Sequence, residues 1–189
     1  PSVLTLQLLN DHGAGERAAA GFAFNESYMA DNDLALGRVV EFLSHTPYWK
    51  NMMIVVTEDD AQGGRDHIDA HRSILMVISP YSKKNFNSHQ HFSFGSIFKT
   101  FWNVLGTSYL NQYDFGVNDL SDCFTGKPDF TPYNAVPVDP RIFDPTKAMS
   151  PLDEKFDWKA FRNSPELDDP DDMKENAKRK DDGRTKVNH

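Results

Sequence analysis

With 189 residues the chain can bury the core of one sizeable domain, although its apolar content of 39% lies below the usual globular range. The formal net charge of -8 argues against a general nucleic-acid or membrane-surface binder, because both need basic patches. A single cysteine excludes an intramolecular disulfide, and no apolar run is long enough to span a bilayer. The sequence begins at Pro1 and enters an apolar run almost at once, so we expect a processed chain or a fragment that lacks its upstream part.

Two elements are predicted before the central part of the chain. Residues 3–9 read as a strand that ends in a polar, glycine-containing turn carrying Asp11 and His12. A helix is predicted from about Glu26 to Ser44, because its apolar residues recur at helical spacing and Asn25 is a suitable N-cap.

Residues 53–72 carry the densest group of chemically active side chains. A continuous, β-branched apolar run over 53–57 is typical of a buried parallel strand, and three carboxylates follow it at Glu58, Asp59 and Asp60. Ligands of open α/β sheets bind outside the carboxyl ends of the strands. Oxygen and imidazole groups crowded at such a strand end therefore predict a divalent metal site.

Another strand and a helix are predicted downstream. Residues 74–79 form a second buried-strand run that Pro80 closes. The helix over 94–105 would follow an N-cap at Ser93 and stop at Gly106, and its wide apolar face is expected to be core. This order of elements fits a layered α/β domain, although the link between the two strands is short for a helical crossover.

Each candidate residue has a structural alternative. The acidic pair Asp59 and Asp60 would also suit a solvated loop, and Asp11 with His12 would suit a turn or cap. However, Asp11 and His12 also follow a predicted strand directly. Two strand ends that both carry Asp or His ligands are the arrangement expected of one crevice that they share. His67 and His71 would be loop ligands or transition-state contacts. Arg72 would bind a phosphate oxygen or pair with the surplus acids. One of His89 and His91 would complete the coordination of a metal ion, or both would be surface groups.

The rest of the chain divides by composition. Residues 1–110 hold the predicted α/β elements, and the proline-rich residues 111–151 are expected to wrap the surface and contribute little chemistry. Residues 152–189 have the charged composition of a disordered or loosely docked tail, with Trp158 and Phe161 as anchors.

Several motifs over residues 4–106 together resemble the bacterial phosphoesterase family of the alkaline phosphatase superfamily. That family includes phosphatidylcholine-type phospholipases C and related acid phosphatases. The matching stretches are Asn10-Asp11-His12, residues 31–37, residues 58–72 and Ile78-Ser79-Pro80-Tyr81.

The resemblance implies a partial domain of an α/β/α sandwich with a mainly parallel, alkaline-phosphatase-like sheet. It also implies hydrolysis of a small phosphate ester or phospholipid head group with divalent metal ions, and an exported protein, periplasmic or secreted. Zn, Mn, Fe, Mg and Ca all remain open as the metal. Carried over by position, the metal ligands are Asp11, His12, Asp59 and Asp60, the catalytic histidines are His67 and His71, and the substrate contacts are Arg72 and His89.

The resemblance places the Ser or Thr nucleophile on an earlier strand and helix. We therefore expect it upstream of Val3, in the missing N-terminal part of the same domain. Two rival interpretations stay open. One is a non-catalytic, metal-stabilised scaffold derived from such a hydrolase, and the other is a two-metal nuclease or phosphodiesterase in which metal-bound hydroxide attacks directly.

Overall fold

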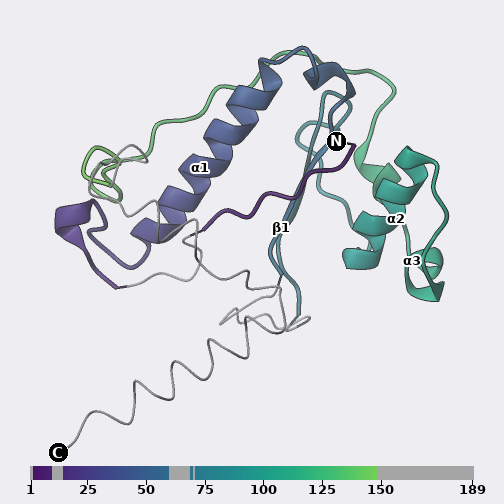
Figure 1. Cartoon of the computed structure of the whole chain (residues 1–189), viewed down its shortest axis with the longest axis horizontal. Helices are drawn as coiled ribbons and strands as arrows, with labels where there is room; N and C mark the ends of the chain where they lie inside the picture. The colour runs from purple at the N-terminus through teal and green to yellow at the C-terminus, as the bar shows by residue number, and fades with distance from the viewer. Residues whose placement is uncertain (1, 10–14, 60–68, 70, 149–189) are drawn as a thin grey trace, which may run out of the picture. The chain divides into compact units, whose positions relative to one another are not determined.

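The computed structural model describes residues 2–9, 15–59, 69 and 71–148 (Figure 1). The chain divides into two units, residues 1–145 and 146–189, and all the described helices and strands belong to the first. The predicted tail over 152–189 lies outside the described residues. Four of the predicted site residues also lie outside them, namely Asp11, His12, Asp60 and His67.

The first long element is helix α1, Ser27–Ser44, which confirms the helix predicted there. The predicted cap at Asn25 is wrong, since the N-cap is Glu26 and its side chain makes no capping bond. The Ser27 hydroxyl instead accepts a hydrogen bond from the backbone N–H of Phe24 at 2.9 Å. Short 3-10 turns flank α1 at Ala18–Ala20 and Trp49–Asn51.

Strands β1, Ile54–Thr57, and β2, Leu75–Ile78, form a two-stranded ribbon. They pair antiparallel, with Ile54 opposite Ile78 and Thr57 opposite Leu75, so the parallel arrangement expected of the 53–57 strand does not hold for this pair. The physical reason is the short link between them, because antiparallel neighbours need no helical crossover. The larger α/β/α sandwich with a mainly parallel sheet stays a prediction.

The strand predicted over residues 3–9 does not appear in the structure. Residues 2–9 pair with no strand in the described part of the chain, and Leu4 and Leu9 expose 81% and 72% of their surface. One contact ties this segment to α1, where the Asn32 side-chain amide donates to the Leu9 carbonyl at 3.0 Å. An apolar run supplies the composition of a strand, but a strand also requires a neighbour to accept and donate its backbone hydrogen bonds.

Helix α2, Phe94–Leu105, begins after Ser93 and ends at Gly106, as predicted. Gly106 takes the left-handed conformation, with φ 67°, that closes many helices. The prediction that its apolar face is core is wrong for the described residues, because Phe98 and Val104 are 45% and 70% exposed. The buried positions of α2 are instead Gly95, Ser96, Ile97 and Thr100.

The small face of α2 packs against two short elements from the segment that was expected to be loop. These are helix α3, Gln112–Gly116, and the 3-10 turn η3, Leu120–Cys123. A β-carbon added at Gly95 would lie 2.7 Å from the Tyr113 ring, so glycine permits this close approach. Leu120 is fully buried, and its backbone N–H donates to the Thr100 hydroxyl at 2.9 Å.

Residues 132–143, which we call the strap segment, run along α1 (Figure 1). At the start of the helix, Phe22 stacks on Tyr28 at 4.3 Å between ring centroids and lies 4.9 Å from Phe143. At its other end, the Ser44 hydroxyl accepts from the Tyr133 N–H at 2.9 Å. None of the helices in the described residues is both long enough and apolar enough to cross a membrane.

Candidate functional site

Two side-chain hydrogen bonds close the base of the hairpin link that carries the predicted site. The Thr57 hydroxyl donates to the Ile74 carbonyl at 3.0 Å, and the Ser73 hydroxyl donates to the Glu58 carbonyl at 3.2 Å. The antiparallel register therefore brings both ends of the 58–73 stretch to one end of the ribbon. Asp59, a predicted metal ligand, and Arg72, a predicted substrate contact, occur near these two ends of the link.

Asp69 and His71 form a local pair within this stretch. One Asp69 carboxylate oxygen accepts from the His71 backbone N–H at 2.8 Å and lies 3.3 Å from Nδ1 of the His71 ring. These two hydrogen bonds, the backbone bond first, hold the pKa of Asp69 below its ordinary value. Nδ1 of His71 therefore lies beside the carboxylate, and the His71 side chain is 96% exposed.

The loop between β2 and α2 carries His89 and His91. Because β2 runs antiparallel to β1, this loop starts at the opposite end of the ribbon from Asp59. The shared crevice predicted for the strand ends that carry Asp11 with His12 and Asp59 with Asp60 stays a prediction, because Asp11, His12 and Asp60 lie outside the described residues.

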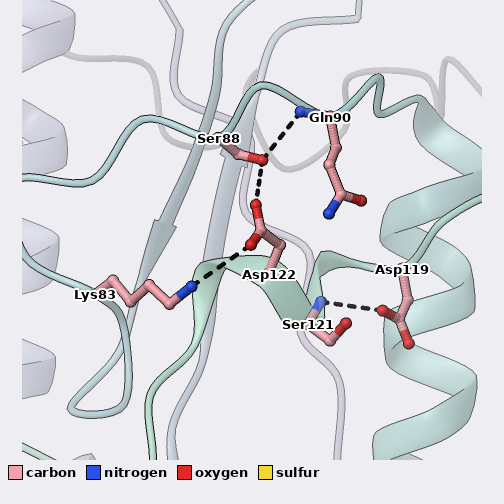
Figure 2. A network of polar contacts seen from close by, with 6 residues as sticks. All are labelled: Lys83, Ser88, Gln90, Asp119, Ser121 and Asp122. Atoms are coloured by element: carbon pink, nitrogen blue, oxygen red, sulfur yellow. Dashed lines mark hydrogen bonds and ion pairs between the residues drawn. The ribbon is translucent and has the colours of Figure 1, made fainter.

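A polar network defined by Lys83, Ser88, Gln90 and Asp122 holds this loop (Figure 2). The Ser88 hydroxyl donates to the Asp122 carboxylate at 2.6 Å and accepts from the Gln90 backbone N–H at 3.2 Å. The other Asp122 oxygen lies 3.5 Å from Nζ of Lys83. The bond from Ser88, and then the charge of Lys83, lower the pKa of Asp122, and His89 adds to the effect.

Backbone contacts on either side reinforce the attachment of the loop to the segment after α3. The Lys83 N–H donates to the Cys123 carbonyl at 2.9 Å, and the Tyr81 carbonyl accepts from the Thr125 N–H at 2.8 Å. Lys84 also pairs with the Asp129 carboxylate. Residues 122–129 therefore hold the segment from Tyr81 to Ser88 that leads to His89, which the sequence did not indicate.

The donor set around the link is chemically suited to a divalent cation, since carboxylates and imidazoles are the usual ligands of zinc and manganese. Within residues 2–9, 15–59, 69 and 71–148, however, no group of three or more such side chains converges closely enough to hold an ion. Asp59 is the one predicted metal ligand that these residues include. The described residues alone thus do not form a complete metal site.

Three side chains close to the candidate residues received no role of their own from the sequence, although Asp69 belongs to the predicted 58–72 motif. The Asp69 carboxylate accepts from the backbone N–H of His71, two residues along the chain. Aspartate commonly bonds backbone at this spacing, so the sequence contained a local signal for this pair. Ser88 and Asp122 are 34 residues apart, and no local pattern links them. Tertiary contacts bring Asp122 to this loop, since η3 packs against α2 and the backbone of Lys83 bonds that of Cys123.

The chain was also compared with known proteins. No protein-family model matches it, and no curated protein sequence matches it significantly. The assignment of a family therefore depends on the motifs in the sequence and on the chemistry of the residues around the hairpin link.

Proposed function

We propose that the chain forms the metal-binding part of a metal-dependent hydrolase of phosphoric esters, of the phosphoesterase type described above. The observation that carries the proposal is the ordered motif over residues 58–72, in which an acidic pair, a Gly-Gly turn and two histidines follow a strand directly. Its substrate would be a phosphomonoester, a phosphodiester or a phospholipid head group.

The side chains divide into groups with different roles. Asp59 and Asp60, together with Asp11 and His12, would hold one or more divalent ions, which neutralise phosphoryl oxygens and activate the nucleophile when bound. Arg72 and His89 would contact the phosphoryl oxygens as donors.

His71 would exchange a proton with the leaving group or the attacking water, and His67 would share this work. The Asp69 carboxylate supports the role of His71, because it lies beside Nδ1 and leaves Nε2 for proton transfer. Such an Asp–His pair also stabilises the imidazolium that forms when the ring takes up a proton. The Ser or Thr that attacks phosphorus is expected upstream of Val3.

The decisive experiment combines a metal-binding measurement with an activity assay on the 189-residue chain. Calorimetric titrations with zinc and with manganese are compared for the parent chain and the Asp59→Asn/Asp60→Asn variant. The expected result is metal binding by the parent that the variant loses. A matched control, Asp129→Asn/Asp139→Asn, removes the same amount of negative charge elsewhere and should bind metal normally.

The activity assay uses p-nitrophenyl phosphate and its bis-ester with a panel of divalent metals. Folded, metal-loaded chain without turnover agrees with a nucleophile on an upstream segment, whereas metal-dependent turnover would show that the chain carries its own nucleophile. Stoichiometric metal binding retained by the Asp59→Asn/Asp60→Asn variant would overturn the site assignment. The scaffold alternative predicts metal binding without phosphate binding, which a titration with inorganic phosphate separates from the hydrolase.

A further inference from the structure

We propose that Ser88 and Asp122 are positioning residues for His89, and that they hold its imidazole ready for a phosphoryl oxygen. The inference rests on the proposed function, because it takes His89 as a phosphate contact. It adds two residues from distant parts of the chain, neither of which belongs to the motifs around the hairpin link.

The geometry of the loop carries the argument. The Ser88 hydroxyl accepts from the Gln90 backbone N–H at 3.2 Å, so His89 is the residue enclosed by this turn. The same hydroxyl donates its proton to Asp122 at 2.6 Å (Figure 2). One oxygen atom thus fixes both the local turn around His89 and its attachment to η3.

Charge strengthens this arrangement. A hydrogen bond from a hydroxyl to an ionised carboxylate is shorter and stronger than one between neutral groups. The Lys83 ammonium lies 3.5 Å from Asp122 and over the Phe86 ring at 4.3 Å from its centroid, so it holds the carboxylate from the other side. The Ser88 side chain is therefore bonded at both its donor and acceptor positions.

The exposure of the histidine explains why it needs such support. His89 is solvent-exposed, and it follows a polar loop in which Phe86 is also 43% exposed. An exposed imidazole on an unrestrained loop loses conformational entropy when it binds a ligand. A turn fixed in advance by Ser88 and Asp122 reduces that loss and so raises the affinity for the anion.

The test measures the affinity of the full chain for inorganic phosphate by calorimetry, with saturating zinc and, separately, manganese. Ser88→Ala is expected to raise the Kd for phosphate about tenfold, the low end for residues that support a ligating group. Ser88→Thr keeps the hydroxyl and should restore the parent affinity. Metal stoichiometry should be the same in all three proteins.

A double-mutant cycle separates positioning from a general structural role. If Ser88 acts through His89, then Ser88→Ala should cause no further loss of phosphate affinity in a His89→Ala background. Asp139→Asn serves as the matched control, since it breaks an ion pair, with Arg141, that is not among the contacts of this loop. This control should leave the Kd for phosphate unchanged.

Each outcome bears on a different claim. Parent-like phosphate affinity in Ser88→Ala, or an equal loss in the presence and absence of His89, would overturn the positioning role while leaving the proposed function intact. A folded, metal-loaded parent chain that binds no phosphate would overturn the proposed function and the positioning role together. Loss in Ser88→Ala, rescue by Ser88→Thr and no loss in the His89→Ala background would support both.

Discussion

Helices α1 and α2 are held in different ways, although both pack against segments that follow α2 in the sequence. Helix α1 is attached to the strap segment largely through aromatic rings, with Phe22 between Tyr28 and Phe143. Helix α2 turns its small and polar face inward, where the Thr100 hydroxyl accepts from the Leu120 N–H and the Trp102 indole donates to Asp114. At α1 the ring cluster acts together with hydrogen bonds of Ser27 and Ser44 to the strap segment, whereas the buried positions of α2 include no aromatic residue.

The difference shows what each attachment requires. Ring contacts tolerate variation in position, because the hydrophobic effect is not directional. Buried hydrogen bonds require the correct partner at the correct place, because an unsatisfied buried group is costly. The region around α2 therefore defines atomic positions more strictly, and it is also the region to which the His89 loop is attached.

The largest expected effect comes from removing the most deeply buried ring of the α1 attachment. Phe143 is 1% exposed, so Phe143→Ala should lower the free energy of unfolding by about 3–5 kcal/mol. Phe42 lies on α1 itself but is 71% exposed. Phe42→Ala should therefore change the free energy of unfolding by less than about 0.5 kcal/mol. Chemical denaturation followed by circular dichroism measures both. Equal losses in the two variants would show that the ring stack does not secure α1.

An intermediate effect is expected from a buried hydroxyl in the α2 attachment. The Thr100 hydroxyl donates to the Ser96 carbonyl at 2.7 Å and accepts from the Leu120 N–H at 2.9 Å. Thr100→Val keeps the shape but leaves that N–H unsatisfied, so stability should fall by about 1–3 kcal/mol. Thr107→Val makes the same change at an exposed position and should be nearly neutral. A neutral Thr100→Val variant would mean that polar contact is not what secures α2.

The smallest expected effect is a local change at low pH. Bonds from the Leu110 and Asn111 N–H groups, and then from the Trp102 indole, hold the pKa of the Asp114 carboxyl below its ordinary value. A lowered folded-state pKa gives stability that is present above the unfolded pKa of about 4 and lost as the pH falls through the folded value.

The indole N–H resonance of Trp102 reports this change, because the group donates to Asp114 at 2.8 Å. It should keep its position down to pH values below about 4 and shift only as Asp114 protonates. Asp114→Asn should abolish that titration. A resonance in the parent chain that moves at the ordinary pKa of aspartate would contradict the assigned bonds.

Local sequence signals predicted the two long helices, α1 and α2, well. Ser93 and Gly106 bracket α2 as expected, and the apolar period placed α1 within a residue or two of its true start. These signals work because capping and helical hydrogen bonds join residues only a few positions apart. The same locality explains the failure over residues 3–9, where a strand-like composition found no neighbour among the described residues.

The sequence by itself determined the two long helices, the residue types at the hairpin link and the chemistry those types imply. Tertiary structure alone decided the inward turn of the small face of α2 and the contact between Ser88 and Asp122. The physical reason is distance along the chain. Contacts between residues tens of positions apart depend on how whole elements pack, and no short pattern in the sequence specifies that packing.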